Sequence, residues 1–192
     1  MEAAKYYRVY DKDKNHLYNL PAGELRKGVV GDDEYLQCVN IIVTQGGEVV
    51  LQVRADTQEA GGFLDIVSGK VDDDDNPDTS AIREVNEEYS VPVEVVAGHL
   101  RKLGVHTATL LKRETLKNWH MNFYHIDVPV DIEIVFDPGE IARLLRVPAG
   151  EIMEFLRENW GRIMLYNLGD VVTESYFQNV VDYVIGCAPD IN

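Results

Sequence analysis

The sequence has little cysteine, few basic residues and no long apolar run. Its 192 residues include only two cysteines, Cys38 and Cys187, and neither belongs to a CxxC pair or a Cys/His cluster. A disulfide framework and a structural zinc site are therefore not expected. No stretch approaches the ~20 apolar residues that span a membrane, and residues 1–6 lack the apolar run of a signal peptide. We expect a soluble, cytoplasmic protein.

Positive charge is scarce as well. Eighteen Lys and Arg residues stand against 33 Asp and Glu residues, which gives a formal net charge of −15. An acidic surface repels nucleic-acid duplexes and anionic membranes, so neither is expected as a partner. An acidic chain that handles phosphate needs positive charge from elsewhere, and a divalent metal ion is the simplest source.

Strand patterns and helix patterns intermix along the chain. Residues 5–20 alternate tyrosines with charged residues around a polar turn, which predicts a hairpin. Further strands are predicted at 36–44, 49–54, 93–97, 106–111 and 120–128. Helices are predicted at 77–89, about 150–158 and about 173–185. This mixture favours a layered α/β domain over a helical bundle or a β-sandwich.

We expect one domain over residues 1–192. Its N-terminal hairpin extension would occupy 1–35, its core 36–160 and a C-terminal helical segment 161–192. The clearest predicted element is the helix after Asn76, which is a good N-cap residue and precedes Pro77 at the first helical position. An apolar stripe on this helix consists of Ala81, Ile82, Val85 and Tyr89.

Three glutamates of this helix are the main candidates for chemistry. At 100° per residue, Glu84, Glu87 and Glu88 share one face, which we expect to lie roughly opposite the apolar stripe. Carboxylates at this spacing repel one another, and only Arg83 balances them on the helix. Eight of the 33 acidic residues fall within 72–88. Such a cluster of oxygen ligands suits Mg²⁺ or Mn²⁺, whereas a solvated acidic face is the alternative.

Residues 69–91 resemble the Nudix box, whose pattern is Gly-x5-Glu-x7-Arg-Glu-apolar-x-Glu-Glu-x-Gly-apolar. The chain has Gly69, five residues, Asp75, seven residues and then Arg83-Glu84-Val85-Asn86-Glu87-Glu88-Tyr89-Ser90-Val91. Seven of the nine fixed positions match without a gap. Asp75 replaces a glutamate that pairs with the arginine in the family, and Ser90 replaces a glycine that turns with positive φ. Neither departure removes a glutamate expected to bind metal.

The resemblance implies an α/β (α+β) fold, the Nudix-type α/β/α sandwich with a mixed β-sheet between helices. It also implies a pyrophosphohydrolase that cleaves the diphosphate linkage of a nucleoside diphosphate bonded to another group. The cofactors would be one to three Mg²⁺ or Mn²⁺ ions, and water would attack phosphorus. Glu84, Glu87 and Glu88 would bind metal, helped by the Gly69 carbonyl, and Arg83 would orient a glutamate.

Further candidates lie outside the box. Glu140 is our candidate for the general base or an additional ligand, because the family often takes this residue from a later loop; an ordinary loop acid is the alternative. Arg54 ends a predicted strand and is a candidate for binding substrate phosphate beside Gly69, with a surface arginine as the alternative. Four scattered histidines are interpreted as structural: His99, His106, His120 and His125.

The substrate stays open between a sugar nucleotide, a dinucleotide and a modified nucleoside triphosphate. Residues 64–70 loosely resemble the approach to the box in ADP-sugar pyrophosphatases. The hairpin and the strand ending at Arg54 resemble the isopentenyl-diphosphate-isomerase-like branch. That activity is disfavoured, since an isomerase needs a cysteine shortly after the strand, and residues 55–68 contain none.

A non-catalytic Nudix-fold module that binds a ligand or a protein is the alternative from another functional class. Such modules tend to lose glutamates of the box, whereas this chain keeps all three. The expected partner is therefore a small molecule that contains a diphosphate. Homodimers are common in the family, and the sequence leaves this state open.

Overall fold

The computed structural model describes residues 5–25, 30–58, 60–112, 115–164 and 170–186. Its strands are β1 (Tyr6–Tyr10), β2 (His16–Pro21), β3 (Tyr35–Gln45), β4 (Glu48–Arg54), β5 (Leu64–Asp65), β6 (Val67–Lys70), β7 (Leu100–Lys112), β8 (Thr115–Asp127) and β9 (Ile141–Pro148). Its helices are α1 (Ala22–Leu25), α2 (Pro77–Tyr89), α3 (Val93–His99), α4 (Ile152–Glu158) and α5 (Asp170–Gly186), with 3₁₀ turns η1 (Ala149–Glu151) and η2 (Trp160–Arg162). Within these described ranges, no helix is long and apolar enough to cross a bilayer.

Strand β3 lies at the centre of a mixed sheet. It pairs antiparallel with β1, β6 and β4. It also runs parallel to β8, from Tyr35 opposite Asn118 to Thr44 opposite Asp127. Strand β7 pairs antiparallel with β8, and β9 pairs antiparallel with β4. The parallel β3–β8 pair among antiparallel neighbours confirms the mixed sheet expected from the sequence.

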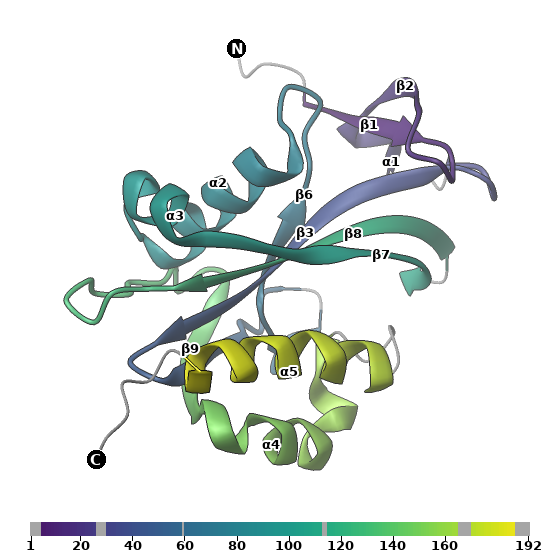
Figure 1. The fold of residues 1–192 in the computed structure, drawn as a ribbon. Coiled ribbons are helices and arrows are strands. Elements are labelled where there is room, and N and C mark those ends of the chain that lie inside the picture. Colours follow the sequence, from purple (N-terminus) through teal and green to yellow (C-terminus); the bar gives the residue numbers. More distant parts are fainter. Residues whose placement is uncertain (1–4, 26–29, 59, 113–114, 165–169, 187–192) are drawn as a thin grey trace, which may run out of the picture.

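Helices cover both faces of this sheet (Figure 1), with α2 and α3 on one face and α4 and α5 on the other. Successive side chains of a strand point to opposite faces, and both faces of β3 are covered. Most of its residues are therefore apolar, on both faces of the strand. Val39 and Ile41 pack with Val85 of α2, whereas Ile42 packs in the second core cluster with Phe177 of α5. The α/β/α arrangement predicted from the sequence is confirmed.

Most predicted elements are confirmed, including the N-terminal hairpin, helix α2 and the C-terminal helix. The strand predicted at 93–97 is wrong, because these residues form helix α3. The segment contains three β-branched valines, Val93, Val95 and Val96, which favour strands in isolation. Pro92 instead occupies the N-cap of this helix, and Val96 is its buried residue, packed in the core cluster on the α2 face. Tertiary packing therefore overrides the local preference.

Candidate active site

The candidate site lies where β6, the loop 71–76 and the start of α2 meet. The Asn76 side chain accepts hydrogen bonds from the N–H groups of Asp78 (2.9 Å) and Thr79 (3.0 Å). The Thr79 hydroxyl accepts one in return from the Asn76 N–H at 3.0 Å. These reciprocal bonds satisfy backbone donors that the first turn of a helix leaves free. The predicted N-cap is confirmed, and it fixes where the helix begins relative to the loop.

The other end of α2 is closed by Ser90. This residue has φ 53° and ψ 23°, which is the left-handed conformation expected of the family's glycine at this position. Its N–H still donates to the Asn86 carbonyl at 2.9 Å. The chain therefore makes the turn of a glycine with a residue that carries a Cβ and meets steric strain there.

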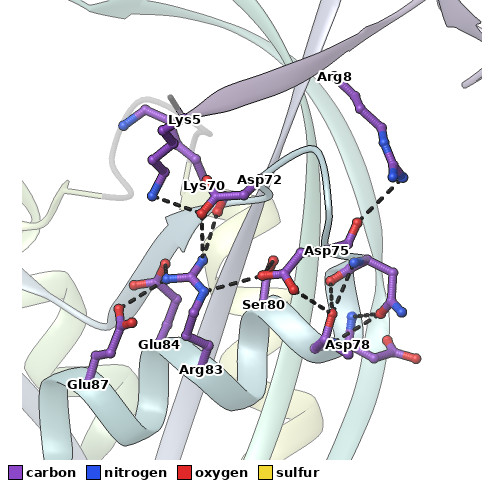
Figure 2. A network of polar contacts seen from close by, with 12 residues as sticks. Lys5, Arg8, Lys70, Asp72, Asp75, Asp78, Ser80, Arg83, Glu84 and Glu87 are labelled. Atoms are coloured by element: carbon purple, nitrogen blue, oxygen red, sulfur yellow. Dashed lines mark hydrogen bonds and ion pairs between the residues drawn. The ribbon is translucent and has the colours of Figure 1, made fainter. Parts of the chain in front are cut away.

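Arg83 is surrounded by carboxylates from both the loop and the helix (Figure 2). Its Nε lies 3.2 Å from Asp75 Oδ2, and its Nη1 lies 2.8 Å from Glu84 Oε1 and 3.0 Å from Glu87 Oε2. Burial alone would lower the pKa of Arg83, but the negative charges of Glu84 and its neighbours raise it. The aspartate at position 75 thus keeps the ion pair with Arg83 even though its side chain is shorter.

Glu84 packs directly on the backbone of Gly69. A Cβ at position 69 would overlap the Glu84 carboxylate, so the close approach needs glycine. The Glu84 side chain is only 13% exposed. Burial raises the pKa of Glu84 to about 7, although the charge of Arg83 acts in the opposite direction.

Glu88 is more deeply buried, with 7% of the residue exposed. Burial raises the pKa of Glu88 to about 8, and the negative charge of Glu84 also raises it. A hydrogen bond from Gln52 acts in the opposite direction. Among the described residues, Glu88 Oε2 finds no hydrogen-bond partner. The prediction that this glutamate lies opposite the apolar stripe is wrong. At 100° per residue it falls only 60° from Val85, so it faces the sheet.

Gln52 is a site residue that the sequence analysis missed. It lies in β4 within a buried apolar stretch, and its side chain is 4% exposed. Its Nε2 donates to the Ile66 carbonyl at 3.3 Å, and its side chain also bonds to Glu88. A buried polar residue in an otherwise apolar strand was the available signal, since such a group needs a partner.

Glu87 points outward from the same helix, with 57% of its side chain exposed. Within the part of the chain that the structure describes, no three Asp, Glu, His or Cys side chains converge as a metal site would require. Arg83 contacts both Glu84 and Glu87 through its Nη1 atom. The structure thus buries Glu84 and Glu88 and leaves Glu87 exposed to solvent.

Glu140 follows a turn in which the Asp137 side chain accepts from the Gly139 N–H at 2.7 Å. Its carbonyl accepts from the Ala55 N–H at 2.8 Å, which ties the turn to the end of β4. The Glu140 side chain is exposed, and its charge contributes to raising the pKa of Glu88. The later loop therefore places Glu140 within electrostatic reach of the box.

Arg54 pairs with Asp65, their Nη1 and Oδ2 atoms being 2.8 Å apart. Asp65 is 5% exposed and also accepts from the Ile66 N–H at 2.9 Å. The charge of Arg54 is thus largely matched by a buried carboxylate inside the protein. Arg54 keeps 21% of its side chain exposed for any further contact.

Two of the histidines are buried in the sheet. His125 lies 2.8 Å from the Thr44 hydroxyl, and burial lowers the pKa of its ring to about 4. His120 Nδ1 lies 2.9 Å from the Thr107 hydroxyl, and its Nε2 lies 3.0 Å from the Asp11 carbonyl. Each ring is held by partners within the fold, in agreement with a structural role.

Glu84 and Glu88 have the ligand chemistry that a divalent cation prefers, although three acidic side chains are not gathered among the described residues of this structure. Glu84 and Glu88 are buried acids whose pKa values are raised, and a nearby cation would favour their ionised forms. Glu88 Oε2 offers an acceptor that no described residue uses. Carboxylate and carbonyl oxygens are the ligands that Mg²⁺ and Mn²⁺ prefer.

Comparison with known proteins places this geometry in a family. A model of the NUDIX domain matches residues 34–168, whereas no curated protein matches the chain. DR0079 from Deinococcus radiodurans is 13% identical with a TM-score of 0.61, over 80% of this chain and 89% of that one. The E. coli dihydroneopterin triphosphate pyrophosphohydrolase is 17% identical with a TM-score of 0.55, over 80% and 99%.

A C. elegans Ap4A hydrolase is 12% identical with a TM-score of 0.52, over 79% of this chain and 98% of that one. At such identities these likenesses show the fold alone. The family assignment rests on the domain match, which covers well over half of the chain and includes the whole box. The chain therefore belongs to the Nudix family, and it is a Nudix hydrolase.

Proposed function

We propose that the protein hydrolyses the diphosphate linkage of a nucleoside diphosphate bonded to another group, and that it depends on Mg²⁺ or Mn²⁺. The observation that carries this proposal is a pair of buried glutamates on one helix: Glu84, which packs on the glycine of the box, and Glu88, which is 7% exposed. Isolated buried carboxylates are costly unless a partner favours their charge. A divalent cation can neutralise both the buried carboxylates and an anionic substrate.

Glu84, Glu87 and Glu88 would hold the metal, together with the carbonyl oxygen of Gly69. A bound divalent ion supplies Lewis acidity toward phosphoryl oxygen and lowers the pKa of an attacking water. Arg83 keeps the helix aligned with the loop through Asp75. Gln52 fixes the buried Glu88 carboxyl by hydrogen bonding, so that this group does not reorient during turnover.

Glu140 is our candidate to accept the proton of the attacking water. It is exposed, it lies on a loop, and its charge reaches Glu88. An exposed base on this loop would be accessible to water while its charge still reaches Glu88. Arg54, which pairs with Asp65 and keeps 21% of its side chain exposed, is our candidate to contact substrate phosphate.

Isomerase chemistry is disfavoured by the position of Cys38. This residue packs with the core cluster that includes Ile42 and Phe177, whereas Val85 of the box helix belongs to the cluster on the opposite face. A thiol across the sheet from the glutamates is poorly placed to act with them. The other cysteine, Cys187, lies outside the described residues.

The substrate panel for testing the proposal follows from the open substrate classes and from the names of the structural neighbours. It contains an ADP-sugar, Ap4A, dihydroneopterin triphosphate and an oxidised nucleoside triphosphate. Products are separated by chromatography after incubation with Mg²⁺, with Mn²⁺ or with EDTA. We expect turnover of at least one compound with either metal and none with EDTA.

Glu87→Gln tests the role of the box in the same assay. We expect kcat to fall by on the order of 100-fold, because the variant removes the charge of a proposed metal ligand itself, which is a larger change than the loss of a residue that only hydrogen-bonds to a ligand. Thermal stability should change little, since Glu87 is exposed. Glu94→Gln is the matched control, because Glu94 is an exposed acid in the first turn of α3, and its kcat should stay at the wild-type value. Turnover of no compound, or an unchanged kcat in Glu87→Gln, would refute the proposal.

A further inference from the structure

The N-terminal hairpin β1–β2 contacts the loop 71–76 through its backbone. Tyr7 forms an isolated antiparallel bridge with Asp72, and the Asp73 N–H donates to the Tyr6 carbonyl at 3.2 Å. The hairpin precedes residue 34, where the family match begins. A segment outside the family's domain thus extends the sheet onto the loop that carries Asp75.

Side chains of the hairpin reinforce this contact. Asn19 Nδ2 donates to Asp73 Oδ2 at 3.1 Å, and Arg8 Nη1 donates to the Asp75 carbonyl at 3.5 Å. Figure 2 shows Arg8 reaching the loop from the strand above it. The loop is therefore held on one side by the hairpin and on the other side by Arg83.

Lys5 and Arg83 meet at the same carboxylate oxygen. Lys5 Nζ lies 2.8 Å from Asp72 Oδ2, and Arg83 Nη2 lies 3.7 Å from that oxygen. The Asp72 side chain is 15% exposed, and among the described residues its Oδ1 finds no hydrogen-bond partner. A poorly solvated carboxylate of this kind needs a close cation.

The distances show which cation satisfies Asp72. Because Lys5 takes the short contact, Arg83 stays at a distance from Asp72 and makes its short contacts with Asp75, Glu84 and Glu87. Without Lys5, Asp72 would draw Arg83 toward it, since Arg83 Nη2 already lies 3.7 Å from Asp72 Oδ2. Such a movement draws the guanidinium away from the glutamates of the box.

We propose that Lys5 is a positioning residue of the active site, which neutralises Asp72 and thereby keeps Arg83 on the carboxylates of the box. The kinetic part of this inference rests on the proposed hydrolase function, whereas its structural part does not. Lys5 acts through Asp72 and Arg83 and does not touch substrate.

The structural part is tested by amide hydrogen exchange on the metal-free protein. We expect exchange of loop 71–76 to accelerate about fivefold in Lys5→Met, since a half-exposed ion pair contributes at most about a factor of five. Lys5→Arg should restore the wild-type rate. Lys12→Met is the matched control, because Lys12 lies at the far turn of the same hairpin and pairs with Asp13 at 2.7 Å. Unchanged exchange in Lys5→Met would overturn the inference.

The kinetic part is tested on a substrate that the wild-type protein turns over. We expect kcat to fall about fivefold in Lys5→Met with an unchanged KM, and Lys5→Arg to recover it. In an Asp72→Asn background, Lys5→Met should have no further effect, because the charge that Lys5 neutralises is absent. A raised KM with an unchanged kcat would instead make Lys5 a substrate ligand and contradict positioning. A loss that persists in Asp72→Asn would do so as well.

The two proposals fail in different ways. If the wild-type protein turns over nothing in the panel, the proposed function is wrong, but the exchange experiment still decides the role of Lys5. If turnover occurs and neither exchange nor kcat responds to Lys5→Met, the function stands and the positioning role is wrong.

Discussion

Glu84 and Glu88 are carboxyl groups held where little water reaches them. Arg83, and more weakly Lys5, favour the ionised form of Glu84, and a hydrogen bond from Gln52 favours that of Glu88. Burial outweighs these groups and raises the pKa of each carboxyl. Buried carboxyl groups with raised pKa values are typical of functional sites. A position that serves only packing is usually occupied by an apolar residue.

Gly69→Ala tests the closest contact of the site. The added Cβ would overlap the Glu84 carboxylate and push that flexible side chain aside. We expect kcat to fall by roughly 100-fold, as small displacements of reacting groups do, with little loss of stability. Gly98→Ala is the control, since a Cβ there meets nothing within 4 Å, and its kcat should match the wild type. A fully active Gly69→Ala protein would mean that the position of Glu84 is unimportant.

The structural roles of individual residues were predictable within the segment that resembles the Nudix box. Asn76 caps the helix, Arg83 pairs with Asp75, and Ser90 takes the positive φ of the absent glycine. Gln52 and Lys5 were missed, because Gln52 in β4 and Lys5 just before β1 are both distant from the box in sequence. Register between such segments depends on tertiary packing, which a motif does not encode.

Helix α2 carries the site, and its two ends are capped differently. The start has reciprocal side-chain bonds between Asn76 and Thr79, whereas the end relies on Ser90 in the left-handed conformation. For residues other than glycine, that conformation costs roughly 1–2 kcal/mol. The backbone of α2 is therefore strained at its C-terminal end, next to Glu87 and Glu88, whereas its first turn is well capped.

Ser90→Gly should relieve this strain. We expect a gain of about 0.5–1 kcal/mol in the free energy of unfolding, because the greater freedom of glycine in the unfolded chain offsets part of the relief. The midpoint of thermal unfolding should rise by about 2 °C for a chain of this size. Ser90→Ala removes the hydroxyl and keeps the Cβ, so it should show no gain. Equal midpoints for the glycine and alanine variants would rule out backbone strain as the cause.

Elements were predictable where local signals agreed. Strands β3 and β4 combine apolar runs with a Gly-Gly turn, and helix α2 has both an N-cap residue and an apolar stripe. Helix α3 was not predictable from propensity, because its valines favour strands while Pro92 and the core favour a helix. The burial of Glu88 was predictable from helix geometry, since it falls only 60° from Val85, but the prediction placed it with the charged face instead.

At the scale of the molecule, a sheet buried on both faces joins the box to the rest of the fold. Strand β8 runs parallel to β3 along its length, and its buried His125 contacts Thr44 of β3 and Tyr183 of α5. Burial lowers the pKa of His125 to about 4, with the charge of Arg101 as a second cause. The folded protein therefore holds this ring neutral at neutral pH.

This histidine makes stability depend on pH. Its folded pKa lies below its unfolded value of about 6.5, so its contribution is complete above that pH and is lost as pH falls toward 4. Between pH 7 and pH 5 the loss should amount to about 2 kcal/mol. Glu84 and Glu88 act in the opposite direction, because their raised pKa values stabilise the protonated fold as pH falls.

Comparison of variants separates these effects in urea unfolding of the metal-free protein. From pH 7 to pH 5, His125→Gln should lose about 2 kcal/mol less than the wild type, since both proteins share the glutamates. His99→Gln, which changes an exposed ring at the end of α3, should follow the wild type. Parallel pH curves for wild type and His125→Gln would contradict a neutral, buried His125.

The central claim is that the glutamates of the box support attack of water at phosphorus, and the most direct measurement is product analysis in ¹⁸O-labelled water. With Mg²⁺ or Mn²⁺, the account predicts that one phosphate-containing product of a panel substrate gains a single ¹⁸O atom. It predicts no labelled product in EDTA and on the order of 100-fold less with Glu87→Gln. Cleavage without label, or labelled product formed equally well without metal, would contradict it.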